Sequence, residues 1–369
     1  MTALVSIWSC MDLNFPIINY CRDKSVLLNG QTHGESYRSA IHELASIRKN
    51  LMIERNPGLK GKTLSDLAHE QWEINLKFYP QLSAELEGIR QGSNTSIEDL
   101  VILNNYTDFR DIQVGEQEGC STVFVRNKQL QLCGQTWDMH SSAMRFVCVI
   151  HVPGQMVLFS LVGCVGMMGY HSSGRMVGVN NLNSTDARSG VIWPALVRAT
   201  LGESELATMR DHLCKAQVTS AHSYLLADRY QAEMWEVLPS LSRCTGRVDI
   251  GESQGSFFHT NHCLNKEVQQ LEVKVGNAST TRDRYALLDK KIANVSDLKD
   301  MEDLLCDHEG YPRSICSHFE SGSQDPSFTC GGSVGELGNG DYIFWRGCRE
   351  EDNYVRHRFK LDAGEFVRQ

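Results

Sequence analysis

The residues whose types and order most clearly permit chemistry are Glu118-Gly119-Cys120-Ser121-Thr122. Glycine accepts backbone conformations that strain other residues, and it leaves its carbonyl open to attack by the next side chain. The Cys120 thiol can attack the Gly119 carbonyl and convert the amide into a thioester, after which water releases residues 1–119. Cys120 then becomes an amino terminus, and its α-amine, with a reference pKa of about 8, can act as the base for its own thiol.

A Gly-Cys dipeptide alone is more typical of a core cysteine at the start of a strand. The sequence after Cys120 strengthens the chemical interpretation, because residues 122–125 and 130–133 are strand-type runs on either side of a turn at Asn127-Lys128. Residue 129 is the midpoint of 120 and 138, since (120 + 138)/2 = 129. A hairpin therefore brings Asp138 near Cys120, subject to register shifts and bulges. A carboxylate there can orient the new ammonium group.

The predicted secondary structure that must position these residues changes near residue 120, from helices before it to strands after it. Apolar residues recur at helical spacing from Glu35 to Met52, and further helices are predicted from Thr63, over 82–89 and after a Ser96 cap. Strands are then predicted over 146–152, 156–162 and 175–182, followed by helices over 193–201 and 203–216 and strands over 223–227 and 233–238. Helices over 282–292 and 296–306, the second capped by Ser296, precede strands near 342–345 and 357–361. These blocks predict an α+β layered sandwich, and residues 1–369 are expected to form a single domain.

Composition and charge narrow the possible partners. The chain has 369 residues, 41% of them hydrophobic, and a net charge of −9, so general affinity for nucleic acid or an anionic membrane is not expected. Since no apolar run reaches the roughly 18 residues of a membrane helix and the amino terminus lacks a signal-peptide pattern, we expect a cytoplasmic protein without membrane association. The 13 cysteines show no repeated spacing.

Motifs along most of the chain resemble one known family in their order and spacing. The chain is similar to the acyl-coenzyme A:isopenicillin N acyltransferase family, the C45 peptidase group of the N-terminal-nucleophile (Ntn) hydrolases. The matching motifs are Gly30-Gln-Thr-His33-Gly34, Leu103-Asn104-Asn-Tyr-Thr107-Asp108-Phe109, Gly119-Cys120-Ser-Thr, Gly134-Gln135-Thr-Trp137-Asp138, Gly174-x-x-Val177-x-Val179-Asn180, His259-Thr260-Asn261-His262-Cys263-Leu264 and Tyr311-Pro312-Arg-Ser314-Ile315-Cys316.

The resemblance implies a four-layer αββα Ntn-hydrolase sandwich and a role for each matched residue. Cys120 would be the thiol nucleophile and, with Gly119, the autocatalytic cleavage site of a zymogen. Asp138 would orient the new α-amine, and Asn261 would donate its side-chain amide to the oxyanion. Supporting positions would be His33, Thr122, Trp137, Asn180 and His262, and a structural rather than a catalytic role is favoured for the two histidines.

The implied partners are a small-molecule amide, acyl-coenzyme A in one version of the reaction, and the chain's own cleaved fragment. Residues 1–119 would form an N-terminal α fragment and residues 120–369 a catalytic β fragment that stay together as a heterodimer. No cofactor and no metal is expected.

Three functions are compatible with this sequence. An Ntn amidohydrolase would pass the acyl group of a linear amide (an N-acyl or N-aminoacyl amine) to Cys120 and then to water, whereas an acyl-coenzyme A-dependent acyltransferase would pass it to an amine. Hydrolysis is favoured, because two arginines of fungal members are replaced here by Ser317 and by Ser323-Gln324. A Cys/His metal-binding protein, suggested by His262-Cys263, Cys306-x-His308 and Cys316-x-His318, is the remote third alternative, since closed zinc sites use tighter, repeated spacings.

Overall fold

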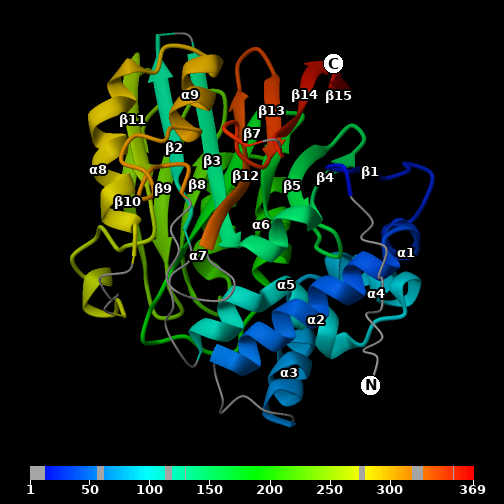
Figure 1. The fold of residues 1–369 in the computed structure, drawn as a ribbon. Coiled ribbons are helices and arrows are strands. Elements are labelled where there is room, and N and C mark those ends of the chain that lie inside the picture. The colour runs from blue at the N-terminus through cyan, green and yellow to red at the C-terminus, as the bar shows by residue number, and fades with distance from the viewer. Residues whose placement is uncertain are drawn as a thin grey trace, which may run out of the picture.

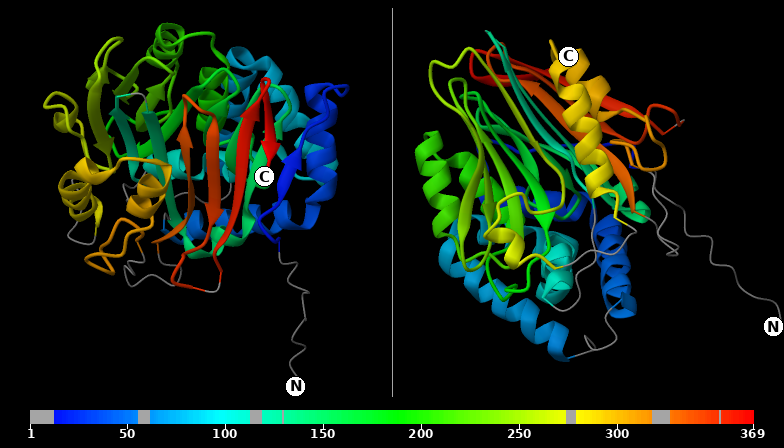
Figure 2. Two further views of the ribbon diagram at one scale, coloured as in Figure 1. Left: turned by 90° about the horizontal axis from the view of Figure 1, so that it is seen from above. Right: turned by 90° about the vertical axis from the view of Figure 1, so that its left-hand side faces the viewer.

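The computed structural model describes residues 13–55, 62–112, 119–128, 130–273, 279–317, 327–351 and 353–369. Two β-sheets pack face to face, and helices cover the outer face of each sheet (Figures 1 and 2). This is the four-layer αββα sandwich that the sequence predicts.

The first helical layer comes from the part of the chain before Cys120. Its helices are α1 (Val26–Ser36), α2 (Arg38–Arg55), α3 (Lys62–Phe78), α4 (Pro80–Ser93) and α5 (Ile97–Asp111), joined later by α6 (Trp193–Gly202) and α7 (Leu206–Lys215). The predicted Ser96 cap is confirmed, since its side chain accepts a hydrogen bond from the Asp99 N–H at 3.0 Å. Helix α5 contains a kink at Asn105, whose φ of −116° is not helical.

The sheet beneath these helices has eight strands in the order β1-β4-β5-β6-β7-β8-β9-β10. Their bounds are β1 (Ile17–Asn19), β4 (Val147–Val152), β5 (Met156–Leu161), β6 (Met168–His171), β7 (Arg175–Leu182), β8 (Ala221–Ala227), β9 (Ala232–Val237) and β10 (Ser242–Val248). Strand β1, from the segment before Cys120, pairs in parallel with β4, whereas the other neighbours are antiparallel.

The second sheet has seven antiparallel strands in the order β11-β2-β3-β12-β13-β14-β15. Their bounds are β2 (Thr122–Asn127), β3 (Leu130–His140), β11 (Gln254–His259), β12 (Ser327–Glu336), β13 (Asp341–Arg346), β14 (Val355–Asp362) and β15 (Glu365–Arg368). Helices α8 (Thr281–Lys291) and α9 (Leu298–Leu305) cover its outer face (Figure 2). Short 3₁₀ turns lie at Ser141–Phe146, Val268–Gln270 and Ile292–Asn294.

The cap predicted for the last helix is wrong by one residue. Asp297, not Ser296, is the N-cap of α9, and its carboxylate accepts from the Asp300 N–H at 2.8 Å. Ser296 contacts the same turn differently, because its hydroxyl donates to the Asp300 carboxylate at 2.6 Å. An aspartate at the cap satisfies the exposed N–H groups of the first turn as well as a serine does, so sequence alone did not separate the two.

The hairpin of β2 and β3 forms around the predicted turn, but its register differs by one residue from the symmetric one. Thr122 pairs with Gln135, and the ladder continues outward until the Asp138 N–H donates to the Gly119 carbonyl at 2.9 Å. Asp138 therefore lies opposite Gly119, and Trp137 is in register with Cys120. The expectation that the hairpin brings Asp138 to the Gly-Cys bond is confirmed, with the carboxylate on the glycine side.

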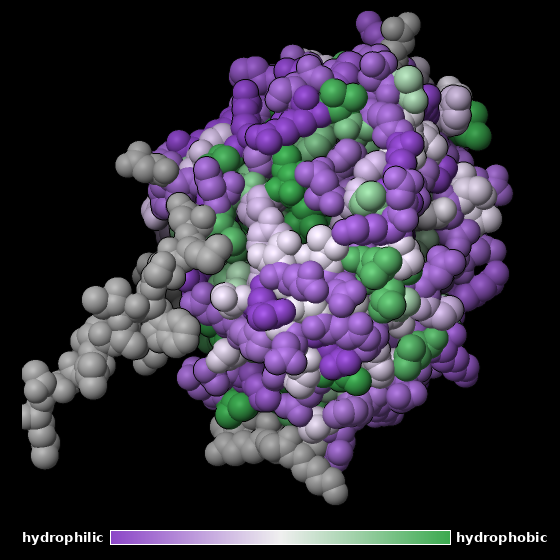
Figure 3. Space-filling model, turned by 90° about the vertical axis from the view of Figure 1, so that its right-hand side faces the viewer, coloured by the Kyte–Doolittle hydropathy of each residue, from purple (hydrophilic) through white to green (hydrophobic). Residues whose placement is uncertain are grey.

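One hydrophobic core joins the segments before and after Cys120. The same cluster of buried side chains includes Leu44 and Tyr106 from the first helices and Trp137 and Tyr224 from the two sheets. On the face shown in Figure 3 the described residues are mostly hydrophilic, with hydrophobic side chains in small patches. Among the described helices, none combines the length and apolar character needed to cross a membrane.

Candidate active site

The Gly119–Cys120 peptide bond is held by hydrogen bonds on both of its sides. The Gly119 carbonyl accepts from the Asp138 N–H at 2.9 Å, and the Cys120 N–H donates to the Asn261 side-chain oxygen Oδ1 at 2.8 Å. Cys120 itself is buried, with 7% of its surface exposed. Asp138 and Asn261, from separate parts of the sequence, thus both contact the Gly119–Cys120 peptide bond.

Gly119 is a glycine because the Asp138 carboxylate leaves no room for a side chain. A Cβ atom at position 119 would lie 2.1 Å from Asp138 Oδ2. The other carboxylate oxygen, Oδ1, accepts from the Thr329 hydroxyl at 2.7 Å, which fixes the carboxylate against the glycine. Close approach, rather than the strained backbone that the sequence suggested, is therefore what requires glycine at this position.

Asn261 lies between β11 and α8, and its orientation is determined by an arginine. Its Oδ1 accepts both from the Cys120 N–H and from Arg284 Nη2 at 2.8 Å. Since a guanidinium only donates, the oxygen must face Arg284, and the amide nitrogen faces the other way. That nitrogen, Nδ2, donates to the Asn181 carbonyl at 2.9 Å. The NH₂ group carries two hydrogens, so this bond is compatible with donation to an oxyanion as well.

Arg284, on α8, was not identified from the sequence. Its guanidinium is 1% exposed and donates to the Cys120 carbonyl at 2.6 Å, to the Ser121 hydroxyl at 3.1 Å and to Asn261. Burial lowers the pKa of Arg284, and the nearby Asp138 carboxylate and Cys120 thiol act in the opposite direction. Arg284 thus fixes both the cysteine backbone and the Asn261 amide. A lone arginine in a helix gives no sequence signal for this role.

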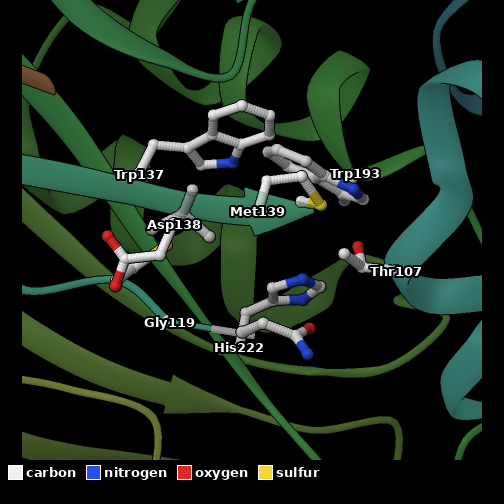
Figure 4. A pocket seen from close by; sticks show the side chains of 10 residues that line it. Thr107, Gly119, Trp137, Asp138, Met139, Trp193 and His222 are labelled. Atoms are coloured by element: carbon white, nitrogen blue, oxygen red, sulfur yellow. The ribbon is translucent and has the colours of Figure 1, made fainter. Parts of the chain in front are cut away.

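A small pocket opens beside Cys120, with a cavity volume of about 20 Å³. Trp137, Met139 and Trp193 form apolar walls, and Thr107 and His222 lie across the cavity (Figure 4). Gly119, Cys120, Asp138, Val179 and Asn181 complete the lining. The cavity thus combines a cysteine, a carboxylate and apolar walls, and in this chain it has room for about one water molecule.

His222 is a second pocket residue that the sequence did not reveal. Its Nε2 lies 3.3 Å from Asp108 Oδ1, and both side chains are buried. The kink of α5 helps to position this part of the pocket, because the Asn105 side chain accepts from the Trp193 N–H at 3.1 Å. Thr107 and Asp108 belong to a motif that carried the family resemblance, so a signal existed for their importance although none existed for His222.

The supporting residues expected from the sequence divide between the pocket and its surroundings. Trp137 lines the cavity, and the buried Thr122 begins β2 two residues after Cys120. Asn180 does not line the cavity, because its side chain donates to the His259 carbonyl at 3.3 Å, and the neighbouring Asn181 lines it instead.

His262 is also outside the cavity lining. Its Nδ1 lies 3.0 Å from the Thr281 hydroxyl, and its ring packs against Tyr285. Burial lowers the pKa of His262 to about 4, so the imidazole is neutral at physiological pH. These contacts fit the structural role expected for it.

His33 lies on α1 and is not part of the pocket lining. Its Nε2 accepts from the Gly163 N–H at 2.9 Å, which requires a neutral ring. Burial, reinforced by the Arg198 guanidinium, lowers the pKa of His33 to about 3. The histidine therefore connects the first helical layer to the sheet beneath it, which agrees with a structural role.

Of the cysteines and histidines that the sequence suggested as metal ligands, only some lie close together in the part of the chain that the structure describes. His318, like Ser323-Gln324, lies outside the described residues, and His262-Cys263 joins no group of three potential ligands among the residues described. His308 and Cys316 do approach each other, together with Cys348. This cluster is separate from the pocket lining.

Comparison with known proteins shows the family of this chain. The family model described as acyl-coenzyme A:6-aminopenicillanic acid acyl-transferase matches residues 125–326, more than half of the chain. A relative from Emericella nidulans, the 40 kDa form of acyl-coenzyme A:6-aminopenicillanic-acid-acyltransferase, is 22% identical over 303 residues, covering 79% of this chain and 82% of its own. The chain belongs to this acyl-transferase family, and as a member of it the chain is an enzyme.

Solved structures show a weaker likeness. The Caenorhabditis elegans orthologue of N-acylethanolamine-hydrolyzing acid amidase is 12% identical, with a TM-score of 0.42 over 59% of this chain and 93% of its own. A variant of the conjugated bile acid hydrolase from Clostridium perfringens is 11% identical, with a TM-score of 0.44 over 68% and 96%. Likeness at this level carries no inference about the reaction of this chain.

Proposed function

We propose that this enzyme cleaves its own Gly119–Cys120 bond and then hydrolyses a linear amide through an acyl-thioester on Cys120. The observation that carries the proposal is the pair of hydrogen bonds on that peptide, from Asp138 N–H to the Gly119 oxygen and from Cys120 N–H to Asn261. The first bond supports the negative charge that develops on the carbonyl oxygen during attack.

Self-cleavage proceeds in two steps, formation of a thioester and its hydrolysis. The Cys120 sulfur bonds to the Gly119 carbonyl carbon, the carbon–nitrogen bond breaks, and the Cys120 nitrogen takes the thiol proton. Water then hydrolyses the resulting thioester, which leaves a carboxylate on Gly119 and an amine and a thiol on Cys120. The Asp138 carboxylate lies beside this position, as the contact with Gly119 indicates, and there it can pair with the new ammonium group.

Substrate turnover repeats this chemistry on a bound amide. The α-amine of Cys120 takes the thiol proton, the sulfur attacks the substrate carbonyl, and the amine product leaves with a proton. In this proposal Asn261 supports the oxyanion through its NH₂ group, and the contact of Arg284 with the amide oxygen on the opposite side favours this role. Water then releases the acyl group as a carboxylate.

The lining of the pocket supports a small amide with an apolar or aromatic portion. Trp137, Met139, Val179 and Trp193 offer apolar contact, while Thr107 and His222 offer hydrogen bonds to one polar group across the cavity. None of the described residues that line the pocket is Lys or Arg, although phosphate groups such as those of coenzyme A are usually bound by these residues. Water is therefore proposed as the acyl acceptor, and an acyl-coenzyme A-dependent transferase is the second candidate, favoured by the family match.

We propose that residues 1–119 and 120–369 form one domain and stay associated after cleavage. Thr107, from the first segment, lines the pocket, and side chains of both segments share one core cluster. Separation of the fragments would expose that core to water. The cytoplasmic location expected from the sequence stays a prediction.

The test is a time course of the purified chain on a denaturing gel with intact-mass analysis. We expect fragments of 119 and 250 residues (369 − 119 = 250) that begin at Met1 and Cys120. Cys120→Ala should remain whole and inactive toward a panel of N-acyl amines. Cys133→Ala is the matched control, a buried cysteine on the same hairpin, and it should be cleaved like the wild type. A wild-type chain that stays whole and still hydrolyses amides would contradict self-cleavage.

The acceptor is tested separately on the cleaved enzyme. Each N-acyl amine is incubated with and without acyl-coenzyme A and with a second amine, and the products are identified by mass. Free acid as the main product supports hydrolysis, whereas an exchanged amide that requires acyl-coenzyme A supports the transferase.

A further inference from the structure

We propose that His308, Cys316 and Cys348 form a binding site for a zinc-class divalent cation. One potential ligand atom from each residue lies within 4.8 Å of the other two, and Cys348 Sγ is 3.2 Å from His308 Nε2. The three residues come from distant segments. His308 follows α9, Cys316 lies in the connection that leads to β12, and Cys348 follows β13.

The spacing of the cluster suits tetrahedral zinc. Zinc–sulfur bonds of about 2.3 Å and zinc–nitrogen bonds of about 2.0 Å place neighbouring ligand atoms roughly 3.5–3.8 Å apart in a tetrahedron. Cys348 Sγ and His308 Nε2 are 3.2 Å apart and all three ligand atoms lie within 4.8 Å of one another, so side-chain rotations can bring them to these distances. Imidazole and thiolate are ligands that zinc prefers. Calcium and magnesium instead bind oxygen ligands.

The surroundings of His308 match those of a metal-binding histidine. Its Nδ1 lies 3.3 Å from the Glu350 carboxylate, which leaves Nε2 directed at the Cys348 thiol. Zinc-binding histidines commonly donate their second ring nitrogen to a carboxylate in this way, which fixes the tautomer that binds the metal. The Glu350 N–H also donates to Cys348 Sγ at 3.4 Å, so one short segment supports two of the three ligands.

The two cysteines are buried, with exposures of 3% for Cys316 and 1% for Cys348. On binding, each thiol gives its proton to solvent, and Zn²⁺ with two thiolates forms a neutral unit. A neutral complex avoids leaving an uncompensated charge in the protein interior. We assign the fourth coordination position to water.

A cation at this site would link the segment before β12, which contains Cys316, to the segment after β13, which contains Cys348. These two segments hold the backbone around Thr329, whose hydroxyl contacts Asp138. The Ser317 N–H, next to Cys316, donates to the Thr329 hydroxyl at 2.7 Å, and this hydroxyl donates to Asp138. From the other side, the Gly347 N–H, next to Cys348, donates to the Cys330 carbonyl at 3.0 Å. The ion would thus fix the backbone on both sides of Thr329, a structural role that does not depend on self-cleavage.

The experiment measures zinc in the full-length chain by elemental mass spectrometry. The protein is purified in reducing buffer, incubated with zinc chloride and dialysed against metal-free buffer. We expect about one zinc per chain, and His308→Ala, Cys316→Ala and Cys348→Ala should each lose most of it. Cys263→Ala is the matched control, because it removes a buried cysteine that follows a histidine but lies outside the cluster, and it should keep the metal.

A second measurement does not depend on the folding of variants. Cobalt(II) added to the wild-type chain should give the intense thiolate-to-cobalt charge-transfer absorption of a sulfur-ligated tetrahedral site, and zinc should abolish it by displacement. Zinc should also raise the melting temperature of the wild type. Catalytic activity is not a readout, so failure of this site and failure of the proposed hydrolase are distinguishable.

Two results would overturn the site. One is a wild-type chain that binds less than about a tenth of an equivalent of zinc and shows no cobalt charge-transfer band. The other is a Cys316–Cys348 disulfide, detected by intact mass after thiol alkylation, that persists in the reducing buffer and blocks both ions.

Discussion

The substitution Gly119→Ala tests whether close packing against Asp138 is required for self-cleavage. The added Cβ would lie 2.1 Å from Asp138 Oδ2, whereas ordinary contacts begin at 3.4 Å. The carboxylate must therefore retreat by about 1.3 Å, the difference between these distances, and this movement breaks its 2.7 Å bond with Thr329. The substitution would also shift the Gly119 peptide, and misplacement of reacting atoms by about 1 Å can slow a reaction about 100-fold, equivalent to roughly 2.7 kcal/mol.

The assay is the half-time for conversion of the full-length chain into fragments, measured on denaturing gels. Gly119→Ala should cleave at least about 100-fold more slowly than the wild type. Gly202→Ala, at the end of α6, is the matched control, since a Cβ there meets nothing within 4 Å, and its half-time should be unchanged. If Gly119→Ala is cleaved within about threefold of the wild-type rate, the carboxylate contact does not position the peptide and the reasoning fails.

Three further substitutions test other parts of the site and fold. Arg284→Lys should slow cleavage about 10- to 100-fold, because one ammonium cannot keep the bonds to both the Cys120 carbonyl and Asn261. The control Arg282→Lys, exposed on the same helix, should leave the cleavage rate unchanged. Equal rates for the two variants would contradict the role of Arg284 in holding Cys120 and Asn261. Trp193→Leu should raise KM for an apolar amide about tenfold and leave the cleavage half-time unchanged; an unaltered KM would remove Trp193 from the substrate site. His33→Gln should weaken the dependence of stability on pH in urea unfolding. The unfolded chain protonates His33 below about pH 6.5 and the folded chain only near pH 3. The free energy of unfolding of the wild type therefore falls by about 1.4 kcal/mol per pH unit as pH falls through this window. Identical pH slopes for the wild type and the variant would show that His33 is not the group responsible.

The sequence by itself singled out the Gly119–Cys120 bond and predicted most of the elements around it. Helix periodicity and caps such as Ser96 depend on neighbouring residues, so these elements could be predicted locally. The hairpin could be predicted for the same reason, because a turn and two short runs define it. The register of the hairpin could not be predicted, because a shift of one residue keeps the turn and both strand-type runs but pairs each residue with a different partner.

Some strands were not predicted because their sequences suit a strand only in context. Strand β12 contains Gly331 and Gly332, residues that are rare in strand interiors. A Cβ at Gly332 would lie 2.4 Å from the Gln135 carbonyl oxygen of the adjacent strand. Packing between strands that are far apart in sequence therefore selects glycine, whereas local propensity argues against a strand there.

Only the tertiary structure decided which side chains join Cys120 and which do not. Arg284 is 164 residues from Cys120 along the chain, yet it donates to the cysteine carbonyl. His222 reaches the pocket from β8, and Cys348 meets His308 from 40 residues away. No local pattern marks these residues, because their roles arise from contacts between segments that only folding brings together. The sequence thus singles out Cys120 as the proposed nucleophile, while the packing of two sheets and their helices assembles the charges and walls around it.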